Sequence, residues 1–147
     1  VVAFFGLVPI LLTFWLITGS SPSWVQWSAA LGLGLLGANV LVVNNYRDRD
    51  DDAAVGKRTL AVRWGGKAMV RLYAVNATMG VAMTVPAWTS LDIRLAVIPA
   101  AAYVLLFLPL CSRMSHETGR VLNRLLGATA RAMVLYSLTF LIAGLML

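Results

Sequence analysis

Hydrophobic residues follow one another in five long runs that short polar connections separate. The runs cover approximately Val1–Thr18, Trp24–Val43, Ala68–Trp88, Ile93–Leu110 and Gly127–Leu147. A transmembrane helix needs roughly 20 apolar residues to cross about 30 Å of hydrocarbon. The runs lack the every-second-residue alternation of membrane β-barrel strands. The pattern therefore predicts an all-α, polytopic transmembrane bundle of about five membrane-spanning helices, with residues 1–147 in one membrane domain.

The composition agrees with this prediction. Hydrophobic residues make up 60% of the 147 residues and charged residues only 12%, against about 45–50% and 25% in soluble domains. This excess excludes a disordered tail, a soluble enzyme core and a disulfide scaffold, and the single cysteine, Cys111, has no internal partner. The net charge of +6 would suggest nucleic acid in a soluble protein. Here the basic residues lie between apolar runs, so we expect a lipid membrane and no nucleic acid as partner.

The connections alternate in charge along the chain. Tyr46–Lys67 holds six basic residues and Arg113–Leu126 holds three, whereas Gly19–Ser23 has none and the turn at Asp92 has only Arg94. Basic connections stay on the cytoplasmic side of a membrane. We therefore predict a multi-pass protein of the cell membrane, with the second and fourth connections in the cytoplasm and the C-terminus outside.

The first residue is Val1, and no basic segment precedes the first apolar run. A secretory signal peptide would begin with such a segment. We expect the chain to begin partway through a larger membrane protein.

A polar segment directly after the second apolar run contains the residues most suited to binding a ligand or a metal ion. It reads Asn44-Asn45-Tyr46-Arg47-Asp48-Arg49-Asp50-Asp51-Asp52, with four aspartates in five residues. If the helix continues, Asn44, Asp48 and Asp52 form one stripe, with neighbouring Cβ atoms about 5–6 Å apart. Carboxylate and amide oxygens suit Mg²⁺, which takes one or two carboxylates together with substrate phosphate oxygens. The spacing indicates a magnesium and phosphate site.

Basic residues follow this acidic stripe at once, in the order Gly56, Lys57, Arg58 and Thr59. The glycine permits a close turn. Lys57 and Arg58 are suited to neutralising phosphate oxygens, and Arg can do so with two parallel hydrogen bonds. Arg63 is a weaker candidate, because setting membrane topology would explain it equally well.

This segment has three other interpretations. In a solvated loop that only sets orientation, the arginines and aspartates would pair with one another. A calcium-binding EF-hand loop fails, because Ala53 stands at the glycine position and Thr59 at the glutamate position. A P-loop fails, because neither Gly56-Lys57 nor Gly66-Lys67 has the required upstream glycine or a following Ser or Thr.

The segment Asn44–Asp52, followed by Gly56-Lys57-Arg58-Thr59-Leu60 and the residues to Gly65, resembles the second aspartate-rich motif of the UbiA superfamily of intramembrane prenyltransferases. The double asparagine and the Gly-Lys-Arg-Thr-Leu are most similar to the menaquinone branch of that family. Phe4–Val8 resembles the start of the family's fifth helix. Leu122–Leu126 with Thr129–Arg131 resembles the approach to its last helix.

The resemblance implies a bundle of roughly nine helices with two aspartate-rich motifs, of which this chain has only the later one. It would then be the C-terminal half, helices five to nine, with the N-terminal half of the same enzyme as partner. Asp48 and Asp52 would hold Mg²⁺, and Asn44, Asn45, Lys57 and Arg58 would contact the diphosphate of a polyprenyl diphosphate. The implied acceptor is 1,4-dihydroxy-2-naphthoate, with 4-hydroxybenzoate or another aromatic as the alternative. The chain alone is expected to be inactive.

Two further classes remain as alternatives. A CDP-alcohol phosphatidyltransferase would need an Asp-Gly pair, which the sequence lacks. A non-enzymatic transporter subunit would place charges at mid-span, whereas the acidic cluster here lies at a span end.

Polar and small residues inside the runs predict helix packing. Asn39, Asn76 and Thr78 are expected to join helices by hydrogen bonds, and the less favoured alternative is that they face a cavity. Ala30, Gly34 and Ala38 recur every four residues and predict a close helix contact. The segment Val121–Leu126 is expected to form an interfacial helix.

Overall fold

The computed structural model describes residues 1–146, so the last residue of the fifth predicted run, Leu147, lies outside the described residues. Within residues 1–146 the protein is helical, without strands. The elements are η1 (Ala3–Leu7), α1 (Val8–Thr18), α2 (Trp24–Arg47), α3 (Arg49–Ala54), α4 (Leu60–Leu91), η2 (Ile93–Ala96), α5 (Val97–Ala102), η3 (Tyr103–Phe107), α6 (Leu108–His116), η4 (Gly119–Val121) and α7 (Leu122–Met146).

Among the described residues, four helical segments are long and apolar enough to cross a membrane, which confirms the predicted multi-pass helical architecture. They are Trp24–Arg47, Leu60–Leu91, Ile93–His116 and Gly119–Ala143. The first predicted span is shorter, since η1 and α1 together cover Ala3–Thr18. At 1.5 Å per residue this helix is about 24 Å long, less than the thickness of the hydrocarbon core.

Two helix starts differ from the sequence prediction. The third span begins at Leu60 rather than Ala68, and Gly65 with φ 77° and ψ 170° kinks it after its first turn. Only glycine adopts such a conformation readily. The prediction of an interfacial helix over Val121–Leu126 is wrong. Leu122 is the first residue of α7, and both Leu122 and Leu125 are buried in the core. Their apolar face packs against the bundle instead of lying in the membrane surface.

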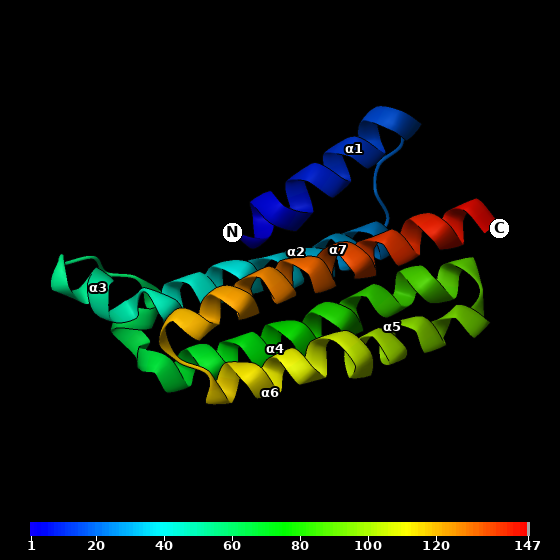
Figure 1. Ribbon diagram of the computed structural model, residues 1–147. Helices are drawn as coiled ribbons and strands as arrows, with labels where there is room; N and C mark the ends of the chain where they lie inside the picture. The colour runs from blue at the N-terminus through cyan, green and yellow to red at the C-terminus, as the bar shows by residue number, and fades with distance from the viewer. Residues whose placement is uncertain (147) are drawn as a thin grey trace.

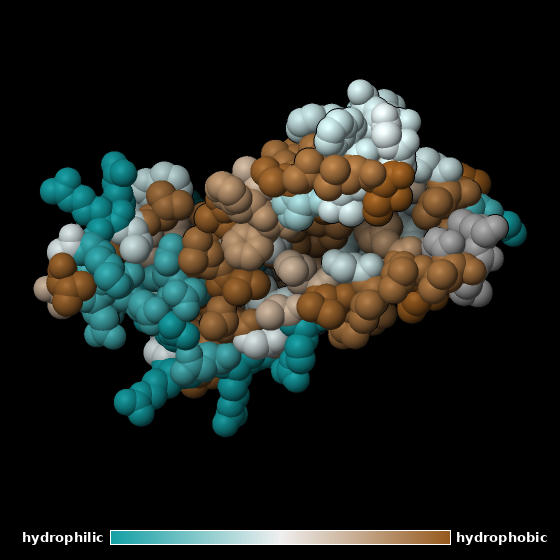
Figure 2. All heavy atoms as spheres, turned by 90° about the horizontal axis from the view of Figure 1, so that it is seen from above, coloured by the Kyte–Doolittle hydropathy of each residue, from teal (hydrophilic) through white to brown (hydrophobic). Residues whose placement is uncertain are grey.

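The helices α2, α4, α5–α6 and α7 lie side by side in a bundle, and α1 stands at an angle above it (Figure 1). One end of the bundle carries α3, the first turns of α4 and the α6–α7 turn. The opposite end carries the α1–α2 link and the α4–α5 turn. Hydrophilic residues gather at the α3 end, on the left of Figure 2, and hydrophobic residues cover most of the bundle. This distribution matches helices that face lipid along their length.

Small residues allow the closest helix contacts. A Cβ atom added at Gly6 would clash with the backbone oxygen of Ala30, and one at Gly34 would lie 2.7 Å from the backbone oxygen of Val2. The small-residue face of α2 therefore packs against η1, which confirms the predicted contact. A Cβ at Gly32 would lie 2.5 Å from the backbone oxygen of Gly80, so α2 and α4 also meet through glycines.

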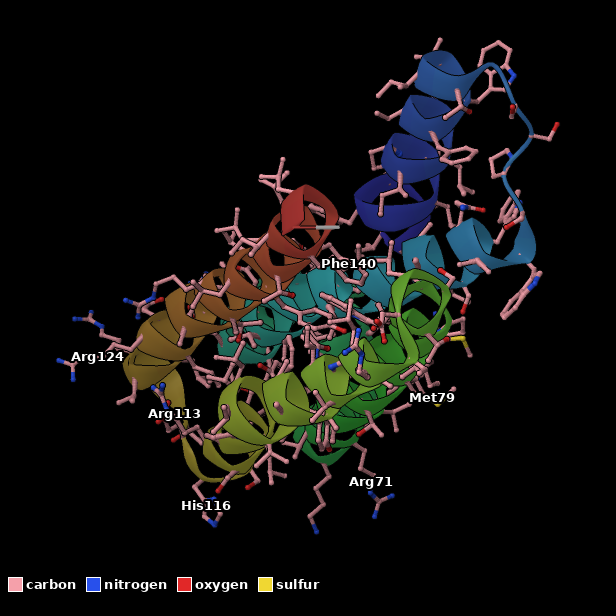
Figure 3. All side chains as sticks on the ribbon, turned by 90° about the vertical axis from the view of Figure 1, so that its right-hand side faces the viewer. Arg71, Met79, Arg113, His116, Arg124 and Phe140 are labelled. Atoms are coloured by element: carbon pink, nitrogen blue, oxygen red, sulfur yellow. The ribbon has the colours of Figure 1, made fainter. Side chains whose placement is uncertain are left out.

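Polar side chains join the helices inside the bundle. Asn39 of α2 donates from Nδ2 to the backbone oxygen of Tyr73 on α4, at 2.9 Å. The Tyr73 hydroxyl is 2.8 Å from Oγ1 of Thr129 on α7. Buried Trp88 stacks on Phe140, with ring centroids 4.1 Å apart, and Phe140 points from α7 towards the interior in Figure 3. Asn39 thus has its predicted role of joining two helices.

Candidate functional site

The acidic stripe keeps its predicted backbone spacing, although the helix is interrupted. α2 ends at Arg47 and α3 begins at Arg49, with Asp48 at the junction. The Asp48 amide donates to the Asn44 carbonyl at 3.0 Å, and the Asp52 amide donates to the Asp48 carbonyl at 2.8 Å. These bonds are of the i to i−4 kind that defines an α-helix. Asn44, Asp48 and Asp52 therefore follow one another at one-turn intervals.

Arg47 holds the first two members of the stripe. Its Nε and Nη2 atoms donate to the two carboxylate oxygens of Asp48, at 2.6 and 2.7 Å. Nη2 also donates to Oδ1 of Asn44 at 2.8 Å. A bidentate arginine fixes the plane of a carboxylate, so Asp48 and Asn44 present their oxygens in a defined orientation.

The last helix contributes to this cluster through Asn123. Nη1 of Arg47 donates to Oδ1 of Asn123, at 2.7 Å, across 76 residues of sequence. Neither Arg47 nor Asn123 was predicted from the sequence as a site residue. Arg47 had a local signal, since it directly precedes Asp48. Asn123 had no such signal in the sequence, apart from its place in the segment that resembles the approach to the last helix of the UbiA family.

Asp52 is held from the other side, by Lys57. The side chain of Asp52 is only 10% exposed, and Nζ of Lys57 donates to its Oδ1 at 2.8 Å. The chain returns through Gly56, whose φ of 75° requires glycine. The Lys57 amide donates to the Asp52 carbonyl at 2.9 Å. The close turn predicted at Gly56 is thus confirmed.

Charge pairing shifts the pKa values of the groups at this end. The hydrogen bond from Arg47 lowers the pKa of the Asp48 carboxyl, and the nearby charge of Lys57 acts in the same direction. The hydrogen bond to Asp52 raises the pKa of the Lys57 ammonium, as does the charge of Asp48. Asp48 is therefore a carboxylate and Lys57 an ammonium at neutral pH.

The remaining candidate site residues are Asn45, Arg58 and Arg63, which belong to the same stretch of the chain and form fewer polar contacts. Asn45 is half-buried and lines a cavity between α2 and α4. Arg58 and Arg63 are exposed, and neither forms an ion pair with another described residue. The pairs Arg47–Asp48, Lys57–Asp52 and Arg49–Asp50 are those that a solvated loop would also form. Burial of Asp52 and the contact with Asn123 distinguish this segment from such a loop.

Within the described residues, no group of three or more His, Cys, Asp or Glu side chains forms a ready metal cage. Mg²⁺ does not need one, because it is commonly held by one or two carboxylates and substrate phosphates. The oxygens of Asp48, Asp52 and Asn44 fit that donor set. Arg113, His116 and Arg124 lie at the α6–α7 turn (Figure 3), which belongs to the same end of the bundle, and Arg113 is paired there with Glu117.

The fold is a multi-pass helical bundle, and one end of it carries polar groups suited to binding phosphate. These features define an intramembrane protein with a candidate phosphate site. Comparison with known protein families identifies the family. The sequence profile of the UbiA prenyltransferase family matches residues 1–126. The chain therefore belongs to the UbiA prenyltransferase family, as the acidic motif indicated.

Two curated relatives agree with this assignment. The 1,4-dihydroxy-2-naphthoate octaprenyltransferase of Haemophilus influenzae is 36% identical over 149 residues, which cover 97% of this chain and 47% of that protein. The protein of the same name from Mycobacterium tuberculosis is 41% identical over 73 residues, covering 50% of this chain and 25% of that protein. The chain thus spans about half the length of the Haemophilus relative. No solved structure matches the chain significantly.

Proposed function

We propose that this chain is the C-terminal half of a Mg²⁺-dependent enzyme that transfers a polyprenyl group from polyprenyl diphosphate to 1,4-dihydroxy-2-naphthoate, in menaquinone biosynthesis. The observation that best supports this proposal is the cluster at one end of the bundle, in which Arg47 and Lys57 fix the carboxylates of Asp48 and Asp52. The names of both relatives support this acceptor and a polyprenyl donor. By the positive-inside rule the cluster faces the cytoplasm.

Asp48 and Asp52, with Asn44, would hold the magnesium ion, and a bound magnesium ion neutralises part of the charge on a diphosphate. Asn45, Lys57 and Arg58 would contact the diphosphate directly. In the reaction the C–O bond to the diphosphate breaks, a C–C bond forms to the aromatic ring, and the ring carboxyl leaves as CO₂. Cationic side chains that are already in place stabilise the departing diphosphate without reorganisation. No protein nucleophile is needed.

The test uses the full-length protein, in which this chain follows the N-terminal helices of the enzyme, reconstituted in vesicles. We expect prenylation of 1,4-dihydroxy-2-naphthoate and little or none of 4-hydroxybenzoate. We expect chelation by EDTA to abolish turnover and added Mg²⁺ to restore it. Preferential prenylation of 4-hydroxybenzoate would contradict the acceptor assignment, and undiminished turnover in EDTA would contradict the metal requirement.

A further inference from the structure

A cavity of about 210 Å³ lies beside the acidic stripe, between α2, α4 and the first two residues of the chain, Val1 and Val2. Its walls are mainly aliphatic, and they include Ala38, Leu41 and Val42 of α2 and Met69 and Leu72 of α4. Ala38 and Val42 are four positions apart and Met69 and Leu72 are three apart, so the lining residues of each helix share one side. An asparagine completes each face, Asn45 on α2 and Asn76 on α4.

Asn76 is an unusual member of this wall. Its side chain is buried, with 7% of the residue exposed, yet it forms no hydrogen bond with any described residue. The only fully enclosed side-chain atom without a partner in the described residues is Oδ1 of Asn39, so the amide of Asn76 opens to the cavity that it lines. Asn76 therefore follows the less favoured prediction, that it faces a cavity, whereas Asn39 and Thr78 do join helices.

The two amides lie at different depths. Asn45 is two residues from the end of α2, at the level of the acidic stripe. The hydrogen bond between Asn39 and Tyr73 places that part of α4 opposite the middle of α2. Asn76 therefore lies deeper than Asn45 by about nine residues, or about 13 Å at 1.5 Å per residue. The cavity thus has an amide near its mouth, aliphatic walls, and a second amide at depth.

The chemistry of the walls decides between the two substrates. A polyprenyl tail has only C–H groups and would leave the amide of Asn76 buried without a partner, which is unfavourable. A hydroxylated aromatic acid has a flat apolar body and polar substituents that can pair with an amide. We propose that this cavity binds the aromatic acceptor, and that Asn76 recognises one of its polar substituents. This inference rests on the proposed function and adds an acceptor site to it.

The position of the cavity suits the reaction. Asn45 follows Asn44, which belongs to the cluster around Arg47, and consecutive residues of a helix point about 100° apart. The diphosphate cluster and the cavity therefore flank the same end of α2. An acceptor with a polar substituent on Asn76 would extend from that amide towards the cluster, so that its ring faces the carbon that the diphosphate leaves.

The central test replaces Asn76 by leucine, which has a similar size and no polar group, in the full-length protein. We expect the KM for 1,4-dihydroxy-2-naphthoate to rise about 10-fold, the size expected for losing a buried polar contact, and the KM for polyprenyl diphosphate to stay unchanged. The matched control is Thr78→Val, two residues away on the exposed face, where Thr78 contacts Tyr103; it should change neither constant. The thermal stability of Asn76→Leu should be retained or raised, because no internal hydrogen bond is lost.

A binding measurement makes the inference independent of turnover. Calorimetry with 1,4-dihydroxy-2-naphthoate alone should show binding to the parent protein and about 10-fold weaker binding to Asn76→Leu. A second variant, Ala38→Leu, should also weaken binding by filling the cavity. A raised KM for polyprenyl diphosphate would place the prenyl tail in the cavity and overturn the proposal. Unchanged acceptor affinity in both variants would overturn it as well, as expected if a preceding segment of the protein fills this space.

If the parent protein binds the acceptor but transfers no prenyl group to it, the proposed function fails while the acceptor site stands. If the parent protein binds no aromatic acid, the acceptor site fails, whatever the turnover. The two failures are therefore distinguishable.

Discussion

Asp52 and Lys57 face each other across the turn at Gly56, with 2.8 Å between Oδ1 and Nζ. The carboxylate is nearly buried, whereas the ammonium group is exposed, with side chains 10% and 65% accessible. Asp51, the neighbouring carboxylate, is exposed and forms no ion pair with a described residue. This asymmetry separates two adjacent aspartates, in agreement with the predicted stripe, which contains Asp52 and not Asp51.

The first prediction compares these two aspartates in the full-length protein. Asp52→Asn should lower kcat by about 100-fold, the size expected for removing one preorganised electrostatic group. Asp51→Asn should change kcat by no more than about 3-fold, because a solvent-exposed charge interacts weakly. Prenyl transfer is measured for both variants at matched expression. Equal losses would show that the stripe of Asn44, Asp48 and Asp52 does not organise the site.

The second prediction concerns the contact between Arg47 and Asn123. Asn123→Ala should reduce kcat/KM for polyprenyl diphosphate by about 10-fold, since a hydrogen bond to a charged group is worth about 1.5–3 kcal/mol. Asn123→Asp, which keeps an acceptor for Arg47, should retain most activity. Arg124→Ala is the matched control, because Arg124 is exposed. An unaffected Asn123→Ala enzyme would mean that α7 does not position the acidic stripe.

The third prediction is topological. Ser21 and Asp51 are exposed at opposite ends of α2, a helix of 24 residues and about 36 Å. In a Cys111→Ser background, Asp51→Cys should react with a membrane-impermeant maleimide only from the cytoplasmic side. Ser21→Cys should react only from the outside. Labelling of both cysteines from one side would contradict the predicted orientation of the spans.

Much of the fold follows from the sequence, because each apolar run must become a helix to satisfy its backbone in lipid. The helix boundaries follow less well. The kink at Gly65 and the burial of Leu122 depend on how segments dock, which hydropathy does not record. The acidic stripe was predictable from its four-residue spacing. The contact of Arg47 with Asn123 and the open amide of Asn76 were not, because both arise only when distant helices pack.

The fourth prediction tests the glycine contact between α2 and α4. Gly32→Ala should destabilise the protein by about 1–3 kcal/mol, as overpacking generally does, because the new Cβ would lie 2.5 Å from the backbone oxygen of Gly80. Gly127→Ala is the matched control, since a Cβ there meets nothing within 4 Å. It should be neutral or stabilise α7 by up to about 1 kcal/mol. Unfolding in detergent compares the two variants, and equal stabilities would refute the close contact.

The last prediction is that residues 1–147 alone transfer no prenyl group. A diphosphate leaving group concentrates negative charge, and under the proposed function this chain would offer Asp48 and Asp52 for one metal ion together with Lys57 and Arg58. Lys57 is largely exposed, so water reaches the diphosphate from the open side. Water screens the stabilising field, because the effective dielectric constant rises from about 20 near a protein surface towards 80 in bulk.

The N-terminal helices would supply the second aspartate-rich motif and a wall that excludes this water. We therefore expect no product from 1,4-dihydroxy-2-naphthoate with the purified chain in detergent or vesicles, and recovery of turnover when the N-terminal half is co-expressed. Asp52→Asn in the co-expressed pair should remove the recovered turnover, which ties it to this chain. Robust Mg²⁺-dependent turnover by the purified chain would refute the prediction, and would mean that a second copy completes the site or that one acidic motif suffices.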